Sequence, residues 1–307
     1  MRKYLVTGIA GFIGSHIAEE LLKRGENVVG IDNFYSGKRE NIEYLESLGE
    51  FSFWENDLRD LRNLERLFRF EKPTHVFHLG AIASVQKSIE DPIFTNAVNV
   101  EGTLNILELS REHRIKRIVF SSSAAVYGDE PTLPKDENSV VKPISPYGYE
   151  KLMGEQYMKL YNELYGVETV SLRYFNVYGE RQDPTSEYSG VISIFENRIK
   201  SGDEVKIFGD GEQFRDFIYV KDIVKLNILA METEKARGET FVCGTGIKTS
   251  INSVFTEITE KHQKDISPKY ENARSGDIRE SLANNSKIRE YFAIDNFIKF
   301  KKGIQKL

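Results

Sequence analysis

The sequence has one cysteine, Cys243, among its 307 residues. A single cysteine excludes an internal disulfide and a cysteine-rich metal site, so we expect no metal and a reducing compartment, the cytoplasm. The chain also lacks a run of about 18 apolar residues that could span a membrane, and its first apolar run is too short for a signal peptide. The net charge of −5 argues against nucleic acid or an anionic membrane surface as a partner.

The sequence does contain a repeated alternation of short apolar runs with amphipathic helical patterns. The apolar runs cover residues 4–7, 27–31, 51–54, 75–78, 117–120 and 169–172, and the helical patterns include 12–24, 61–70 and 96–113. Runs that are apolar throughout are typical of parallel strands buried on both faces. The alternation therefore predicts an α/β fold with a doubly wound parallel Rossmann sheet.

The pattern loosens after residue 178, where polar, glycine-containing loops separate shorter elements. We expect residues 1–177 to form the first domain and residues 178–307 a smaller C-terminal α/β lobe. Residues 215–235 are expected to return to the first domain.

A glycine-rich turn, "GIAGFIG" at 8–14, lies between the first predicted strand and the first predicted helix. Glycines allow a tight turn and let backbone amide groups approach a pyrophosphate at a helix N-terminus. A glycine motif in this context predicts a dinucleotide site, whereas an isolated one would be weak evidence.

Acidic residues after the second and third strands indicate which dinucleotide binds. Asp32 follows Gly14 by 18 residues, where a carboxylate accepts hydrogen bonds from the adenosine ribose and repels a 2′-phosphate, so NAD is favoured over NADP. Lys38 and Arg39 nearby leave some room for NADP. Asp57 is expected to hold the adenine amino group, to cap a helix that starts at Leu58, or to do both.

Tyr147 and Lys151 stand four residues apart in "SPYGYEK" at 145–151, after a Ser-Pro that predicts a helix start. Residues i and i+4 share one face of a helix, so both side chains can reach one bound molecule. Chance alone gives about one such Tyr-Lys spacing in this chain, so the spacing by itself does not show a catalytic pair.

Several motifs in the same order resemble the extended short-chain dehydrogenase/reductase superfamily. They are the glycine turn, "SSSAAVYG" at 121–128 and "YGYEK" at 147–151. "LRYFNVYGERQDP" at 172–184 and "GDGEQFRDFIYVKD" at 209–222 are similar to motifs of the UDP-glucose 4-epimerase and UDP-N-acetylglucosamine 4-epimerase family. The resemblance covers nearly the whole chain.

The resemblance implies an NAD-dependent isomerase that epimerises C4 of a UDP-hexose through a 4-keto intermediate. Tyr147 would be the acid/base, Lys151 its partner, and Ser123 the group that holds the reacting hydroxyl. Moving a tyrosine pKa from about 10 to about 7 takes about 4 kcal/mol, which one cation about 4 Å away supplies at an effective dielectric of about 20. We therefore expect Lys151 and the positive nicotinamide ring to lower the pKa of Tyr147.

The resemblance also implies the residues around each ligand. NAD would contact Gly8, Gly11, Phe12, Ile13, Gly14, Asp32, Asn33, Ser36, Gly37, Asp57, Leu58, Leu79, Gly80, Ala81, Asn99, Tyr147, Lys151 and Tyr174. The UDP-sugar would contact Ser84, Val85, Ser123, Tyr147, Asn176, Val191, Arg215, Arg274, Asp277 and Ser281, with Ser88 nearby. Asn99 has a competing interpretation as a buried helix cap, and each arginine as a surface charge. Gly80 replaces a more frequent alanine, which we expect to alter only packing.

Ser281 occupies the position that gates the sugar in this family, four residues after Asp277. A bulky tyrosine there excludes an N-acetyl group, whereas serine leaves room for one. The resemblance thus implies activity on UDP-N-acetylhexosamines (UDP-GlcNAc and UDP-GalNAc) as well as on UDP-glucose and UDP-galactose. It further implies a homodimer that packs through residues 96–113 and 151–165.

Three other functions compete with epimerisation at C4. A 4,6-dehydratase would carry Asp-Glu where Ala124 and Ala125 stand, so its acid and base are missing. A UDP-glucuronate epimerase or decarboxylase is less cleanly excluded, although no cationic residue for a carboxylate stands out in the sugar-facing motifs. A non-catalytic dinucleotide sensor would be expected to lack Tyr147 or Lys151.

Overall fold

The structure is a computed structural model that describes residues 2–184, 190–273 and 279–307. It divides into two compact units. The first comprises Met1–Glu130, Val140–Arg173 and Val224–Phe241, and the second comprises Pro131–Ser139, Tyr174–Ile223 and Val242–Leu307. The domain limits expected from the sequence, at residue 177 with a return of residues 215–235, stay a prediction.

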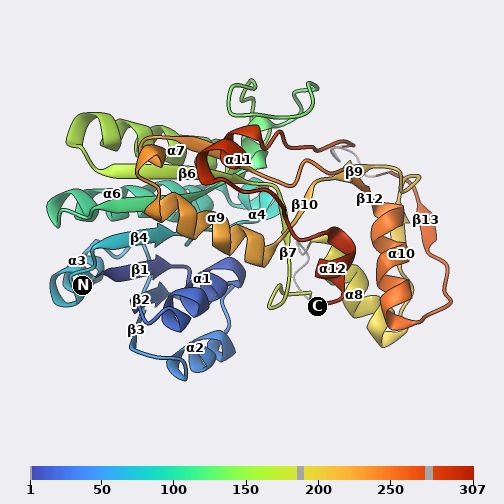
Figure 1. The fold of residues 1–307 in the computed structure, drawn as a ribbon, viewed down its shortest axis with the longest axis horizontal. Helices are drawn as coiled ribbons and strands as arrows, with labels where there is room; N and C mark the ends of the chain where they lie inside the picture. The colour runs from blue at the N-terminus through green and yellow to red at the C-terminus, as the bar shows by residue number, and fades with distance from the viewer. Residues whose placement is uncertain (1, 185–189, 274–278) are drawn as a thin grey trace. The chain divides into compact units, whose positions relative to one another are not determined.

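The first unit alternates strands and helices along the chain (Figure 1). In order these are β1 (Lys3–Thr7), α1 (Phe12–Lys23), β2 (Asn27–Asp32), α2 (Arg39–Glu46), β3 (Phe51–Glu55), α3 (Leu61–Glu71), β4 (His75–His78), α4 (Val85–Glu90), α5 (Pro92–Asn96), the π-helix η1 (Ala97–Glu101), α6 (Gly102–Glu112), β5 (Arg117–Ser123), the 3₁₀-helix η2 (Ala124–Tyr127), α7 (Pro146–Tyr165) and β6 (Glu168–Tyr174). The chain returns through α9 (Val220–Glu232), the 3₁₀-helix η3 (Glu234–Ala236) and β11 (Thr240–Cys243).

Seven strands form one parallel sheet in the order β11-β6-β5-β4-β1-β2-β3. Strand β1 pairs with β4 on one side and with β2 on the other, so the strand order reverses at β1. A reversal of this kind opens a crevice at the carboxyl ends of the strands, where ligands bind in such folds. The predicted doubly wound Rossmann sheet is confirmed, and each of the six predicted strands lies within one of its strands.

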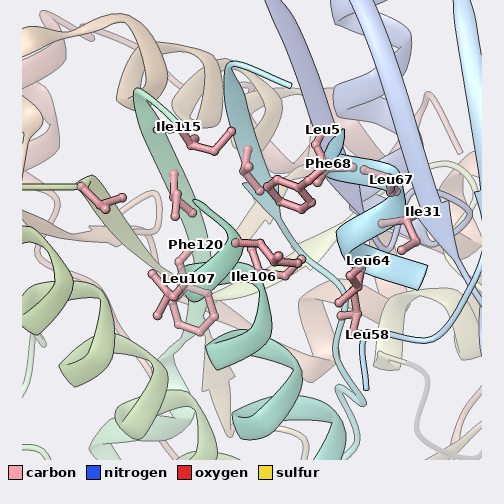
Figure 2. Packing of buried hydrophobic residues seen from close by; sticks show 14 of the residues in the cluster. Leu5, Ile31, Leu58, Leu64, Leu67, Phe68, Ile106, Leu107, Ile115 and Phe120 are labelled. Carbon is pink, nitrogen blue, oxygen red and sulfur yellow. The ribbon is translucent and has the colours of Figure 1, made fainter. Parts of the chain in front are cut away.

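The core of this unit lies between the sheet and helices α3, α6 and α7 (Figure 2). Leu5 and Ile31 from the strands meet Leu64, Phe68 and residues of α6, and all of them are almost completely buried. Burial of a leucine or phenylalanine side chain is worth about 1.5–3 kcal/mol, so this cluster fixes the layer beneath the crevice.

Helix α7 begins as the Ser-Pro motif predicts. Ser145 is the N-cap, and its side-chain oxygen accepts a hydrogen bond from the Gly148 amide at 3.2 Å, with Pro146 in the first turn. The helix ends at Gly166, whose φ of +69° is a left-handed conformation that glycine adopts without strain. These two ends set where Tyr147 and Lys151 stand.

The second unit is smaller and built from short elements. They are β7 (Asn176–Tyr178), α8 (Val191–Ser201), β8 (Lys206–Phe208), β9 (Phe214–Arg215), β10 (Phe217–Tyr219), β12 (Thr249–Ser250), α10 (Ile251–His262), β13 (Lys269–Glu271), α11 (Ser286–Phe292) and α12 (Phe300–Ile304). Three two-stranded sheets pair β10 with β7, β12 with β9, and β13 with β8. Within the described part of the chain, no helix is both long enough and apolar enough to cross a membrane.

Candidate active site

The glycine turn brings backbone against backbone at the carboxyl end of β1. A Cβ atom on Gly14 would lie 2.2 Å from the Gly8 carbonyl oxygen, and one on Gly8 would lie 2.8 Å from the Gly80 amide nitrogen. Gly8 also has φ +68°, which favours glycine. Gly11 is the N-cap of α1 and offers no side chain to cap the helix, so the first turn is suited to bind a pyrophosphate.

Asp32 joins the next loop to this turn. Its Oδ2 accepts a hydrogen bond from the Ala10 amide at 3.0 Å, and its Oδ1 accepts one from the Phe34 amide at 2.8 Å. Burial raises the pKa of Asp32 above its usual value, and the backbone hydrogen bonds oppose that rise. Each carboxylate oxygen keeps a second lone pair for a ribose hydroxyl, as the prediction requires.

Arg39, one of the two basic residues that left room for NADP, does not offer a free site for a 2′-phosphate. The Arg39 guanidinium donates to both carboxylate oxygens of Glu55, at 3.1 and 3.2 Å, and lies 4.2 Å from the ring centroid of Phe34. Its charge is thus already matched by a carboxylate on the neighbouring strand.

Asp57 does not cap a helix, so that part of the prediction is wrong. The helix starts at Leu61 with Asp60 as its N-cap, whose Oδ1 accepts from the Asn63 amide at 3.1 Å. Asp57 instead accepts hydrogen bonds from the Arg59 guanidinium and from Asn33 Nδ2, at 2.9 and 2.8 Å. The Arg59 side chain lowers the pKa of Asp57, so the group is an anion at neutral pH.

Gly80 closes the loop after β4 onto β1. The Thr7 hydroxyl accepts from the backbone amides of Leu79 and Gly80, at 3.1 and 2.9 Å. A Cβ atom on Gly80 would lie 2.7 Å from Leu58 Cδ1, so glycine allows this loop to approach Leu58 closely. This is the packing effect expected of the glycine, and it places the loop beside the glycine turn.

The three predicted catalytic residues come together in the first unit. Ser123 ends β5, its hydroxyl accepts from the Ala125 amide at 3.1 Å, and the same side chain lowers the pKa of the Tyr147 phenol. Lys151 Nζ donates to the Ser121 carbonyl at 2.8 Å and lies 5.8 Å from the Tyr147 ring centroid. Tyr147 and Lys151 are both buried.

The lowered pKa expected for Tyr147 with Lys151 and the nicotinamide ring beside it stays a prediction, and the chain by itself acts in the opposite direction. Burial raises the pKa of Tyr147 to about 12, although the hydrogen bond from Ser123 lowers it in part. Burial lowers the pKa of Lys151 to about 8. Removing the phenolate from water costs more than the ammonium supplies, because the Lys151 amine is committed to a backbone carbonyl and not to the phenol.

Ser88 positions the backbone of the catalytic helix. Its hydroxyl accepts from the Tyr147 amide at 3.0 Å and donates to the Val85 carbonyl at 2.6 Å, and the residue is completely buried. Ser84 is the N-cap of α4, with its oxygen accepting from the Lys87 amide, and Val85 is 45% exposed. Of these three, Ser88 acts on the catalytic helix itself.

Ser122 donates a hydrogen bond to a buried carboxylate. Its hydroxyl lies 2.5 Å from Glu155 Oε1. Glu155 also accepts two hydrogen bonds from the Arg173 guanidinium, at 2.9 and 2.8 Å, and Arg173 donates to the Tyr127 hydroxyl. This buried network holds the strand end that carries Ser123, and no sequence motif pointed to Glu155.

Asn99 lies inside the π-helix and is not a helix cap. Its Oδ1 accepts from the Ile82 amide at 2.7 Å, and its Nδ2 donates to the Ile82 carbonyl and to Glu150 Oε2 at 2.6 Å. Glu150 is buried in α7 and also accepts from Thr95. Asn99 therefore ties the β4 loop to the catalytic helix, and π-turns of this kind occur often at functional sites.

The predicted substrate residues of the second unit lie in two places. Ser281 is next to Arg215 in β9, because the Ser281 amide donates to the Phe214 carbonyl at 3.2 Å. Asn176 donates to the Asp216 carbonyl at 3.0 Å. Val191 begins α8, and Tyr174 ends β6. Arg274 and Asp277 lie outside the described residues.

Asp216 is a buried residue that the sequence did not single out. Its two oxygens accept four hydrogen bonds, from the amide and hydroxyl of Thr245 and from the amides of Gly246 and Ala283. The carboxylate thereby fixes the chain two residues after Ser281. Burial raises the pKa of Asp216, and its hydrogen bonds oppose the rise.

A glycine turn at a helix N-terminus, a carboxylate at the end of the second strand, and a Ser-Tyr-Lys group where β5 meets α7 are the features of an NAD-dependent enzyme of the extended short-chain dehydrogenase/reductase class. The NAD-dependent epimerase/dehydratase family model matches residues 4–244, and the chain belongs to this family.

Relatives and solved structures narrow the class. A UDP-glucose 4-epimerase of Mycolicibacterium smegmatis is 38% identical over 98% of this chain and 96% of its own length. A UDP-glucose 4-epimerase from Thermotoga maritima, solved with UDP-glucose, superposes with a TM-score of 0.93 at 39% identity, covering 99% of this chain and 96% of that one. A UDP-N-acetylglucosamine 4-epimerase from Methanobrevibacter ruminantium, solved with UDP-N-acetylmuramic acid, superposes with a TM-score of 0.93 at 38% identity. It also covers 99% of this chain and 96% of that one. The chain is thus an enzyme of the UDP-sugar 4-epimerase type that uses NAD.

Proposed function

We propose that this protein interconverts UDP-hexoses at C4 and accepts N-acetylated sugars. The observation that carries the proposal is the assembly of Ser123, Tyr147 and Lys151 at the carboxyl edge of the sheet, beside the glycine turn. The chemistry that bound NAD supplies is reversible oxidation of the sugar at C4.

Tyr147 would exchange a proton with the O4 hydroxyl of the sugar. Ser123, which lowers the pKa of the phenol, would hold the same hydroxyl and keep it in line for transfer. With a pKa of about 12, the phenol keeps its proton at neutral pH until a positive charge is bound beside it. The 4-keto intermediate would then turn within the pocket and be reduced on its other face.

Lys151 would hold the cofactor ribose and not act on the sugar. Its ammonium donates one hydrogen bond to the Ser121 carbonyl, which leaves two N–H groups for ribose hydroxyls. The pKa of about 8 leaves most of the amine protonated at neutral pH. The predicted NAD contacts of the glycine turn, Asp32 and the loop of Leu79, Gly80 and Ala81 surround the same edge of the sheet.

The nucleotide would be held by the second unit, through the predicted residues Asn176, Val191, Arg215, Arg274 and Asp277. Ser281 is the feature that favours N-acetylated sugars, because a serine leaves space that a tyrosine would fill. We expect Ser281→Tyr to lose turnover of UDP-N-acetylglucosamine and to keep turnover of UDP-glucose.

The decisive assay incubates the purified protein separately with UDP-N-acetylglucosamine, UDP-N-acetylgalactosamine, UDP-glucose and UDP-galactose, and follows the anomeric protons by NMR. Interconversion within the N-acetyl pair supports the proposal. Turnover of UDP-glucose with none of UDP-N-acetylglucosamine would refute the prediction that N-acetylated sugars are substrates. UDP-glucuronate in the same assay tests the main rival. Full turnover by Tyr147→Phe would refute the catalytic role of the phenol, whereas no turnover of any of these sugars by the wild type would favour a binding-only function.

We also propose that the protein is a homodimer. Four apolar residues of α7, Tyr149, Met153, Leu160 and Leu164, are between 42% and 64% exposed, at spacings of four, seven and four residues that place them on one side of the helix. A stripe on a single helix suits pairing with its copy about a two-fold axis. Light scattering should give a dimer mass for the wild type and a monomer mass for Leu164→Glu.

A further inference from the structure

The loop after β2 and helix α5 meet through their aromatic side chains. The rings of Tyr35 and Phe94 have centroids 5.4 Å apart and are inclined by 45°. The Arg59 guanidinium also lies over the ring of Phe94, 5.1 Å from its centroid. Tyr35 remains 51% exposed, so burial in the core of the protein does not explain its position.

Each member of this group stands on a different connection at the carboxyl edge of the sheet. Tyr35 follows β2, Arg59 follows β3, and Phe94 lies in α5, beyond β4. Strand β1 lies between β2 and β4 in the sheet. The β2 loop and the segment that follows β4 therefore leave from strands on either side of β1, whose own connection is the glycine turn.

The three side chains differ in how firmly they are held. Phe94 is fixed because its amide donates to Asp91 at 3.2 Å and the neighbouring Thr95 hydroxyl donates to Glu150 of the catalytic helix at 2.6 Å. Arg59 is fixed by two hydrogen bonds to Asp57, each 2.9 Å. Tyr35 is held by a short turn, in which its amide donates to Asn33 Oδ1 at 3.1 Å.

We infer that Tyr35, Phe94 and Arg59 form an aromatic clasp that closes over bound NAD and slows its release. The inference rests on the proposed cofactor position at the glycine turn. Phe94 and Arg59 form the fixed side of the clasp, and the Tyr35 loop is the side that opens. Retention suits an enzyme whose cofactor ends each turnover in the state in which it began, since release between turnovers serves no purpose.

The test measures how fast NAD leaves the protein. Wild type, Tyr35→Ala, Tyr35→Phe and Phe94→Ala are loaded with NAD, and the NAD that stays bound is followed against time after dilution. Tyr270→Ala is the matched control, because Tyr270 is a tyrosine of similar exposure, 53%, and lies in the second unit. Thermal unfolding of each variant verifies that it is folded.

We expect Tyr35→Ala and Phe94→Ala to release NAD about tenfold faster than wild type, the loss of roughly one aromatic contact. Tyr35→Phe keeps the ring and should release NAD at the wild-type rate, as should Tyr270→Ala. If the wild type holds NAD and Tyr35→Ala releases it no faster, the clasp is wrong and the proposed function stands. If the wild type holds no NAD, the proposed cofactor site fails, and the clasp fails with it.

Discussion

The ion pair between Glu155 and Arg173 gives a prediction whose size follows from its burial. The two side chains are 3% and 7% exposed, and the pair makes two hydrogen bonds, with a third from Ser122. Removing one member of a buried pair leaves an uncompensated charge and costs about 3–5 kcal/mol. We expect Glu155→Gln and Arg173→Met each to lower the free energy of unfolding by about that amount.

Replacement of both members should recover most of the loss. An apolar pair of similar volume avoids the desolvation of two charges, and such replacements are often neutral. The double variant Glu155→Leu, Arg173→Met should therefore be more stable than either single variant. Urea unfolding at pH 7, with the slope compared between variants, measures all three changes. A loss below about 1 kcal/mol in Glu155→Gln, or a double variant that is less stable than both single variants, would refute the reasoning.

Three further predictions concern the glycine turn, a buried histidine and Asp216. A Cβ atom on Gly14 would meet the Gly8 carbonyl oxygen at 2.2 Å, so Gly14→Ala should abolish NAD binding in a titration, and a variant with unchanged affinity would contradict the fit. Burial lowers the pKa of His78 to about 3, so between pH 6.5 and 3 the unfolded state binds a proton that the folded state does not. As the pH is lowered through this range, the free energy of unfolding should therefore fall by up to about 1.4 kcal/mol per pH unit. Denaturation at a series of pH values should show a shallower fall for His78→Gln than for wild type, and equal slopes would disprove the assignment. Asp216→Asn replaces an acceptor of four hydrogen bonds with a group that also donates, so it should lower the unfolding free energy by about 2–3 kcal/mol in urea unfolding, and an unchanged midpoint would argue against this role.

The sheet and the start of the catalytic helix follow from local sequence. Continuous apolar runs predicted strands such as β1, because a strand buried on both faces has no polar side to show. Ser145 and Pro146 predicted the helix start through the cap and the first-turn proline, which depend on neighbours only.

Other features depend on partners distant in sequence, and the sequence did not predict them. The π-helix at Ala97–Glu101 arises where Asn99 bonds to Ile82 and Glu150, 17 and 51 residues away. Glu150 and Glu155 look like solvent-facing charges in a helical pattern, and only the folded chain shows them buried with donors. The raised pKa of Tyr147 in the chain by itself also depends on the fold, because burial outweighs a nearby cation that is bound to a carbonyl.

The proposed chemistry is tested most directly by the hydrogen on C4 of the sugar. UDP-N-acetylglucosamine carrying deuterium at C4 is incubated with the purified protein in ordinary water, and the product is analysed by NMR and mass spectrometry. Because the hydrogen taken from C4 is returned to the same carbon, the UDP-N-acetylgalactosamine formed should keep the deuterium. Product that carries ordinary hydrogen at C4 would contradict oxidation and reduction at that carbon within one closed site.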